Sequence, residues 1–151
     1  MAKRESREQT KARAARIART LAGLYPQARI SLDFQTPWQC LAATILSAQC
    51  TDERVNQVTP ALFAKYPDPA AMAASDPREV QEMIVTTGFF REKTKSLRAA
   101  AQDIVERFGG KVPDTMEALV TLRGVGRKTA NVVLGHVYGK PGMVVDTHVR
   151  R

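Results

Sequence analysis

The sequence predicts an all-α fold, a helical bundle or barrel, and three observations lead to that prediction. At Thr36, Thr59 and Asp76, a side chain that can cap a helix is followed by proline, which is a common start of an α-helix. Glycines such as Gly88 and Gly109 stand at the ends of segments with helical periodicity, where a left-handed residue stops a helix. No segment shows sustained alternation of apolar and polar residues, since the run MVV is too short for a strand.

The first part of the chain supplies five expected helices. They cover residues 5–23, 38–49, 52–58, 61–66 and 78–87. The first is rich in Ala and Arg, carries Ile17 and two leucines at helical spacing, and ends before Pro26. The second is apolar or small almost throughout, which predicts burial. The third and fourth follow Thr51 and Thr59 as caps, and the fifth follows Asp76.

The rest of the chain supplies three more helices. They cover residues 90–108, 115–122 and 130–138. A Gly-Gly pair ends the first of these, and Asp114 with Glu117 forms a capping-box-like start for the second. The third follows a glycine turn and ends at Gly139. Asp146 would cap a further helix, yet too few residues follow it for one, so we expect the chain to be part of a longer polypeptide.

The net charge of +8 is concentrated near the N-terminus. Residues 1–29 hold eight Lys or Arg against Glu5 and Glu8, a net charge of +6, whereas the other residues together carry +2. Such a basic end indicates attraction to a polyanion, either nucleic acid or an anionic membrane surface. A solvated helix or a frayed tail explains it equally well. A transit peptide would also be rich in Arg, but it normally lacks acidic residues.

The composition excludes several classes of protein. Apolar residues make up 44% of the 151, which is enough for one folded domain rather than a disordered chain. No apolar run reaches the roughly 18 residues of a membrane span, and no hydrophobic signal segment opens the chain. Cys40 and Cys50 match neither a metal site nor a disulfide framework. We expect both to be small, semi-buried residues in a reducing, intracellular setting.

The segment LRGVGRKTANVVLG, residues 122–135, places a glycine turn at the start of an apolar helix. Gly124 and Gly126 can adopt backbone angles forbidden to other residues and can turn the chain sharply between two helices. We expect the N–H groups of Gly124, Val125 and Gly126 to point outward at a helix N-terminus, where they would bind an anion such as a DNA phosphate. The alternative is a tight turn that binds no ligand.

Lys128 stands in the first turn of that helix, where positive charge is unfavourable. The helix end and partial desolvation both disfavour its ammonium form, which leaves more of the neutral amine, a nucleophile for electrophilic carbon. A simple contact with phosphate is the alternative. The helix spans roughly 15 Å to Tyr138, and residues 139–145 can reach back roughly 23–25 Å. Asp146 can therefore return to Lys128 as a base or as a stabiliser of a cationic transition state, or it can merely cap a helix.

Four segments resemble the endonuclease III family of helix-hairpin-helix DNA glycosylases. They are LRGVGRKTANVVLG, the VVDTH that follows it, LSAQCTD at 46–52 and TGFF at 87–90, within a similarity that covers residues 30–151. The resemblance implies an enzyme of base excision repair, a bifunctional DNA glycosylase and abasic-site lyase. Such an enzyme removes oxidised pyrimidines from duplex DNA and then nicks the strand by β-elimination.

The resemblance also implies a role for each matching residue. Lys128 is the nucleophile that attacks sugar C1′ and forms a Schiff base, while Asp146 activates it and stabilises the oxocarbenium-like sugar. Gln49 enters the base stack opposite the lost base, and Phe89 wedges in from a neighbouring loop. The remaining residues expected to bind DNA are Gly124, Val125, Gly126 and Arg127. If the resemblance is set aside, Gln49 is expected to be an ordinary polar residue after a helix, and Phe89 can equally be a core contact.

Other polar residues have simpler explanations. Lys93, Lys95 and Arg98 could meet phosphates, but solvated charge is the default expectation for all three. His136 lies roughly 12 Å along the helix from Lys128, too far for direct proton transfer. His148 could support the nearby aspartate, although a structural histidine is expected.

The resemblance implies three parts in the whole protein. Residues 1–29 form a basic N-terminal helix or tail, and residues 30–151 form the glycosylase domain with its helix-hairpin-helix at about 115–138. A further domain, absent here, commonly carries a 4Fe–4S cluster on four cysteines, so we expect the chain to be either a fragment or a form without that domain. Because the N-terminal helix packs with that domain in the family, we expect the 151 residues alone to be poorly stable. The expected partner is double-stranded DNA with a damaged pyrimidine or an abasic site. We expect the protein to bind this DNA as a monomer in the cytoplasm, on the nucleoid if it is bacterial. We expect no membrane partner.

Two alternative functions explain part of the pattern. A mismatch-specific adenine glycosylase shares the fold and the aspartate, but it typically lacks a lysine at the position of Lys128. A helix-hairpin-helix module that binds DNA without cutting it would explain the charge and the glycines. It would leave Asp146 and the apolar residues before it without a role.

Overall fold

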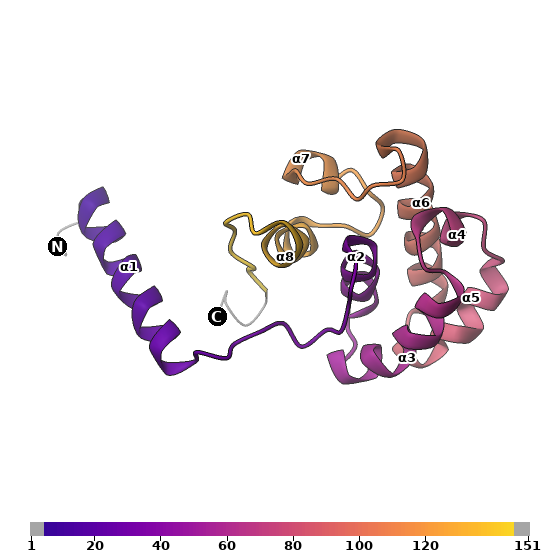
Figure 1. The fold of residues 1–151 in the computed structure, drawn as a ribbon, viewed down its shortest axis with the longest axis horizontal. Helices are drawn as coiled ribbons and strands as arrows, with labels where there is room; N and C mark the ends of the chain where they lie inside the picture. The colour runs from indigo at the N-terminus through magenta and orange to yellow at the C-terminus, as the bar shows by residue number, and fades with distance from the viewer. Residues whose placement is uncertain (1–4, 147–151) are drawn as a thin grey trace. The chain divides into compact units, whose positions relative to one another are not determined.

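The computed structural model describes residues 5–146, and every regular element in that range is a helix. The elements are α1 Arg7–Leu24, α2 Pro37–Leu46, α3 Asp52–Lys65, α4 Pro69–Ala73, α5 Pro77–Ile84, the 3-10 turn η1 Val85–Thr87, α6 Phe90–Phe108, α7 Met116–Leu119 and α8 Arg127–Tyr138 (Figure 1). The chain divides into two compact units, one ending at Ile30 and one beginning at Ser31. The all-α prediction is confirmed. Within the described range, no helix has the length and apolar character needed to cross a membrane.

The first unit contains α1, which is a regular helix with a complete capping box. The Ser6 hydroxyl accepts a hydrogen bond from the Gln9 N–H, and the Gln9 side chain accepts one from the Ser6 N–H. The helix ends at Leu24, with Tyr25 as its C-cap, and so stops before Pro26 as predicted. None of its residues is buried, and Ile17 and Leu21 are about half exposed.

The core of the second unit is built around α2. This helix starts as predicted, because the Thr36 hydroxyl accepts from the Gln39 N–H and proline occupies the first turn. Eight of its ten residues are buried, and it packs against α3, α6 and α8. In Figure 1, α2 stands between α8 on one side and α6 on the other. Each fully buried leucine of this helix, such as Leu41, contributes about 2–3 kcal/mol of apolar transfer free energy.

One boundary prediction is wrong in the region of Thr59 and Pro60. The structure has a single helix, α3, with Pro60 inside it, rather than two helices separated by a new start. A proline in a helix interior costs about 3 kcal/mol. Thr59 is buried and does not cap, while Leu62 and Phe63 continue the buried face beyond the proline. Burial of that continuous face offsets the lost backbone hydrogen bond.

Two further details of the helix starts differ from expectation. The sequence does not predict the short helix α4, because five residues are too few to show a periodicity. Asp68 caps this helix by accepting a hydrogen bond from the Ala71 N–H at 2.8 Å. Thr115, not Asp114, caps α7 by accepting from the Ala118 N–H. Asp114 instead forms an ion pair with Lys140 at 2.8 Å, which connects the start of α7 to the end of α8.

Candidate functional site

The turn between α7 and α8 requires glycine at one of its two glycine positions. Gly124 has a φ of 78°, and a Cβ placed on it would lie 2.7 Å from the Ser96 Cβ of α6. Gly126 has a φ of −93° and an extended backbone that any residue can adopt. A Cβ on Gly126 would meet no atom within 4 Å. The expectation of a forbidden backbone conformation is confirmed for Gly124 and wrong for Gly126, whose missing side chain leaves open space in front of α8.

Gly124→Ala is expected to lower the free energy of unfolding by about 2–4 kcal/mol, because it combines left-handed strain with overpacking against Ser96. Gly126→Ala is the matched control, and it should cost about 1 kcal/mol or less as a change of N-cap. Urea unfolding of both variants measures the difference. Equal losses would show that the close approach of the turn to α6 has no energetic weight.

The hairpin leaves the start of α8 without a side-chain cap. Gly126 supplies no acceptor, and the first turn holds no acidic residue. The Val125 N–H donates to the Leu122 carbonyl at 3.1 Å and its side chain is buried, so the expectation that this amide points outward is wrong. The first amides of α8 itself remain without a side-chain acceptor. An uncapped helix start with open space in front of it favours an anion.

Lys128 occupies the second position of α8 and is exposed. Its side chain makes no hydrogen bond or ion pair with any other residue in the described range, and neither does the side chain of its exposed neighbour Arg127. Arg123, on the other side of the turn, contacts Glu92 at 3.4 Å. The amine of Lys128 is therefore accessible beside the electropositive end of α8.

The segment after α8 runs back along the helix toward Lys128. The Lys140 N–H donates to the Leu134 carbonyl, and the Asn131 side chain then donates to the Met143 carbonyl at 2.9 Å. Gly142 permits this return, since a Cβ on it would lie 2.7 Å from the Asn131 Oδ1.

Asp146 follows three residues after Met143 and is half-buried, with a polar or electrostatic contact of its own. Three extended residues reach at most about 10 Å, and Asn131 lies about 4.5 Å along the helix axis from Lys128. A segment of this length is long enough for Asp146 to reach the N-terminal half of α8.

Gln49 and Phe89 share an unusual backbone conformation. They are the only two non-glycine residues in the described range with a positive φ, at 50° and 47° respectively. Such a left-handed conformation costs a non-glycine residue about 1–2 kcal/mol, and it is found preferentially at functional sites. Gln49 is exposed and Phe89 is 65% exposed, which makes the core-contact alternative for Phe89 wrong. No feature of the sequence predicts this strain.

The three cations Lys93, Lys95 and Arg98 differ in their surroundings. Lys95 is exposed and pairs with Glu92 at 2.7 Å, as expected of a surface charge. Lys93 is only 5% exposed, and Arg98 is half-buried with its side chain directed to the Ala73 carbonyl at 3.4 Å. The expectation of solvated charge is wrong for these two. His148 lies outside the described residues.

The two cysteines behave as small core or surface residues. Cys40 is fully buried, and this burial raises the pKa of its thiol to about 11. Cys50 is half-buried beside Gln49 and has no disulfide partner. Within residues 5–146, no group of three or more His, Cys, Asp or Glu side chains is arranged to hold a metal ion.

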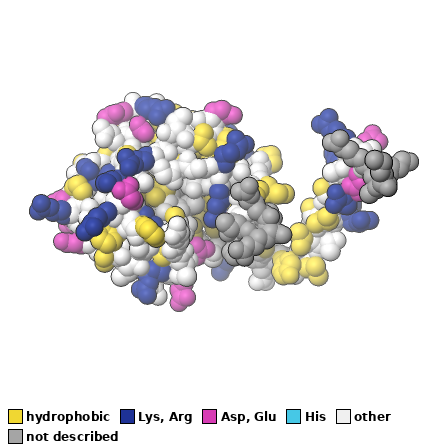
Figure 2. Space-filling view, turned by 180° about the vertical axis from the view of Figure 1, so that it is seen from behind, with side chains coloured by type: hydrophobic (Ala, Val, Ile, Leu, Met, Phe, Trp, Pro, Cys, Tyr) yellow, Lys and Arg dark blue, Asp and Glu magenta, His cyan; other side chains and the backbone are white. Residues whose placement is uncertain are grey.

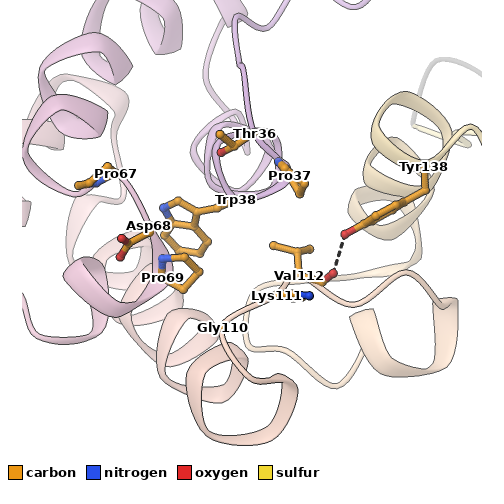
Figure 3. Close-up of a pocket in the computed structure, with 10 residues that line it drawn as sticks. All are labelled: Thr36, Pro37, Trp38, Pro67, Asp68, Pro69, Gly110, Lys111, Val112 and Tyr138. Carbon is orange, nitrogen blue, oxygen red and sulfur yellow. Dashed lines mark hydrogen bonds between the residues drawn. The ribbon is translucent and has the colours of Figure 1, made fainter.

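A cavity of about 330 Å³ lies away from Lys128 and Gln49. Figure 3 shows it at the start of α2, where Trp38 lines it, and at the end of α8, where the Tyr138 hydroxyl donates to the Val112 carbonyl at 2.5 Å. Lys128 is at the opposite end of α8, and Gln49 follows the opposite end of α2. The cavity therefore does not belong to the candidate site.

Figure 2 shows basic and acidic side chains intermingled on the visible surface, so any attraction for an anion depends on local geometry.

Comparisons with known proteins identify the family. Residues 42–151 match the family model described as HhH-GPD superfamily base excision DNA repair protein. Endonuclease III of Synechocystis sp. is 60% identical over 142 residues, covering 93% of this chain and 65% of that protein. Endonuclease III of Escherichia coli strain K12 is 40% identical over 126 residues, covering 83% of this chain and 60% of that protein.

Solved structures extend the likeness to the fold. A trapped endonuclease III–DNA covalent intermediate has a TM-score of 0.85 and 37% identity, covering 91% of this chain and 65% of that one. A non-covalent endonuclease III–DNA complex gives the same score and identity, with 92% of this chain covered and 65% of that one. The chain spans slightly less than two thirds of the length of these relatives. With a family model matched over residues 42–151, this chain belongs to the HhH-GPD superfamily of base excision DNA repair proteins.

Proposed function

We propose that this protein is a bifunctional DNA glycosylase and abasic-site lyase that removes oxidised pyrimidines from duplex DNA. The observation that carries the proposal is the setting of Lys128, an exposed amine in the first turn of an uncapped helix. The return segment tied to Asn131 adds a carboxylate within reach of that turn. The covalent DNA intermediate trapped for a relative 37% identical to this chain supports the same chemistry.

In the proposed reaction, the neutral amine of Lys128 attacks sugar C1′ as the bond between C1′ and the base breaks. The electron pair of that bond leaves with the base. The new C–N bond becomes an imine as the C1′–O4′ bond breaks; the electron pair of that bond goes to O4′, which takes up a proton released from the amine. Loss of a proton from C2′ then expels the 3′ phosphate by β-elimination. Asp146 accepts the proton from the lysine and offsets the positive charge that develops on the sugar.

The remaining site residues would hold the DNA in the required shape. The open amides at the start of α8 receive a backbone phosphate, which positions the strand without reading its sequence. Extruding the damaged nucleotide costs a few kcal/mol of stacking and pairing. Gln49 and Phe89, both exposed and left-handed, are presented outward and would fill the space that it leaves.

A 4Fe–4S cluster is the cofactor that the relatives suggest, but the residues of this chain do not fit one. Such a cluster takes four thiolate ligands, and the sequence holds two cysteines. One of them, Cys40, is fully buried in α2 with the pKa of its thiol raised to about 11, which disfavours a thiolate. No step of the proposed reaction uses the cluster. The proposed location is the bacterial cytoplasm, where the DNA lies.

Borohydride trapping tests the proposed function. The protein is incubated with duplex DNA containing one abasic site in the presence of borohydride, which reduces an imine to a stable bond. We expect a covalent adduct, mapped by peptide mass spectrometry to Lys128. A duplex with an oxidised pyrimidine should yield the same adduct after release of the base. Binding without an adduct would favour the non-catalytic module, and release of mismatched adenine would favour the adenine glycosylase.

A further inference from the structure

Lys93 is the one charged side chain that the structure buries among the residues it describes. It lies in the first turn of α6 and is 5% exposed, and no carboxylate in the described range pairs with it. An ammonium group in such a place is costly unless its hydrogen bonds are satisfied. Burial lowers the pKa of Lys93, and the Cys50 thiol acts in the opposite direction. A cation retained under these conditions needs a structural reason.

Its position provides that reason, because Lys93 forms hydrogen bonds with both ends of residues 87–89, the Phe89 loop. The Lys93 Nζ donates to the Thr87 carbonyl at 2.7 Å, and the Lys93 backbone N–H donates to the Phe89 carbonyl at 3.0 Å. Gly88, with a φ of 71°, lies between these two attachment points. The Thr87 hydroxyl is itself bonded to the Ile84 carbonyl at 2.8 Å, so the loop has little freedom on the side facing the core.

The same amine also interacts electrostatically with Cys50. Cys50, whose thiol acts electrostatically on Lys93, directly follows Gln49 in the chain. The turn η1, which leads into the Phe89 loop, also packs against α3 and α6. Lys93 is therefore bonded directly to the segment that carries the left-handed Phe89.

Resting on the proposed function, we propose that Lys93 is a positioning residue that fixes Phe89 in the conformation needed to hold DNA with one nucleotide extruded. It touches neither the DNA nor the reacting atoms. The carbonyl of Thr87 receives the ammonium hydrogen bond, and this fixes the backbone that presents the Phe89 ring. The expected defect on losing the amine is therefore confined to substrates that must be unstacked.

The test compares two substrates on the same protein. Lys93→Met keeps the length of the side chain and removes the amine. Its rate is measured by borohydride trapping with an abasic site in duplex DNA, which requires extrusion, and in single-stranded DNA, which does not. We expect the ratio of duplex rate to single-strand rate to fall at least tenfold. An equal fall in both rates would mean that Lys93 merely supports the core, and the proposal would be wrong.

Two controls separate positioning from stability. Ile104→Val removes one buried methylene from the same helix, about 16 Å from Lys93, and should leave the ratio of the two rates unchanged. Gly88→Ala strains the exposed loop without a clash, because a Cβ there meets no atom within 4 Å, and it should lower the ratio as Lys93→Met does. If Lys93→Met does not fold, Gly88→Ala decides the matter, and an unchanged ratio would overturn the proposal.

Two further measurements address mechanism and keep the inference distinct from the proposed function. In a Phe89→Ala background, Lys93→Met should lower the ratio less than threefold further, because both changes remove the same wedge; full multiplicative effects would contradict the proposal.

If the wild-type protein forms no adduct with either substrate, the proposed function fails. The positioning role is then read from 2-aminopurine fluorescence in a duplex with a stable abasic analogue. A signal increase upon wild-type binding that Lys93→Met abolishes would support it, and an equal increase would overturn it.

Discussion

Lys128→Gln is expected to abolish the borohydride-trapped adduct and to slow strand nicking by at least about 10⁴-fold, because the amide has no nucleophilic lone pair. The affinity for abasic duplex should change by only a few-fold. The Lys128 side chain is exposed and makes no hydrogen bond or ion pair within the described part of the chain, so we expect its replacement to leave the fold intact. Single-turnover cleavage and equilibrium binding on the same duplex give the two quantities.

The neighbouring residue provides a matched control for charge. Arg127→Gln removes the same unit of positive charge from the same helix start, at an equally exposed position. It should weaken binding and reduce the salt dependence by about one counterion if it meets a phosphate, while the adduct still forms. Substantial nicking by Lys128→Gln would show that another nucleophile carries the reaction, and the assignment of Lys128 would be wrong.

The sequence alone predicts those features of the site that depend on neighbouring residues. The turn at Gly124 and the helix after it are encoded within one short segment, and the structure has them where expected. The return of the chain after α8 follows from simple reach, and the Asn131 contact agrees with it. These features are predictable because no distant part of the fold is needed to produce them.

The features that the sequence does not predict depend on tertiary contacts. Pro60 remains inside α3 because the buried face continues past it. Lys93 is buried because the loop before α6 folds back over its side chain and accepts a hydrogen bond from it. The left-handed backbone of Phe89 depends on the same contacts, so no local pattern of residues could indicate it.

The helix starts give a physical criterion that separates the site from the rest of the fold. The α-helices α1 to α5 and α7 begin with a side chain that accepts a hydrogen bond from a first-turn N–H. Only α6 and α8, among the α-helices described, lack that cap. Their starts carry Phe89 and Lys128 respectively. Departures from local rules are expected at functional sites, and here both departures fall at the proposed DNA-binding surface.

Asp146→Asn is expected to lower the rate of base removal by about 10²–10³-fold and to leave DNA affinity within a few-fold of wild type. The amide has nearly the same shape, so the half-buried position can accept it, but it neither takes a proton nor offsets positive charge on the sugar. Trapping on a pre-formed abasic site should be slowed much less, because no base remains to be expelled and no oxocarbenium-like sugar has to form.

The contrast between the two substrates identifies the step in which Asp146 acts. Asp114→Asn is a suitable control, since it also removes one carboxylate, but from an exposed site that contacts Lys140 at the far end of α8. It should leave both rates unchanged. Equal slowing of base removal and abasic-site trapping by Asp146→Asn would place the carboxylate in lysine activation alone. Unchanged rates on both substrates would mean that the return segment past Asn131 brings Asp146 to α8 only as a structural contact.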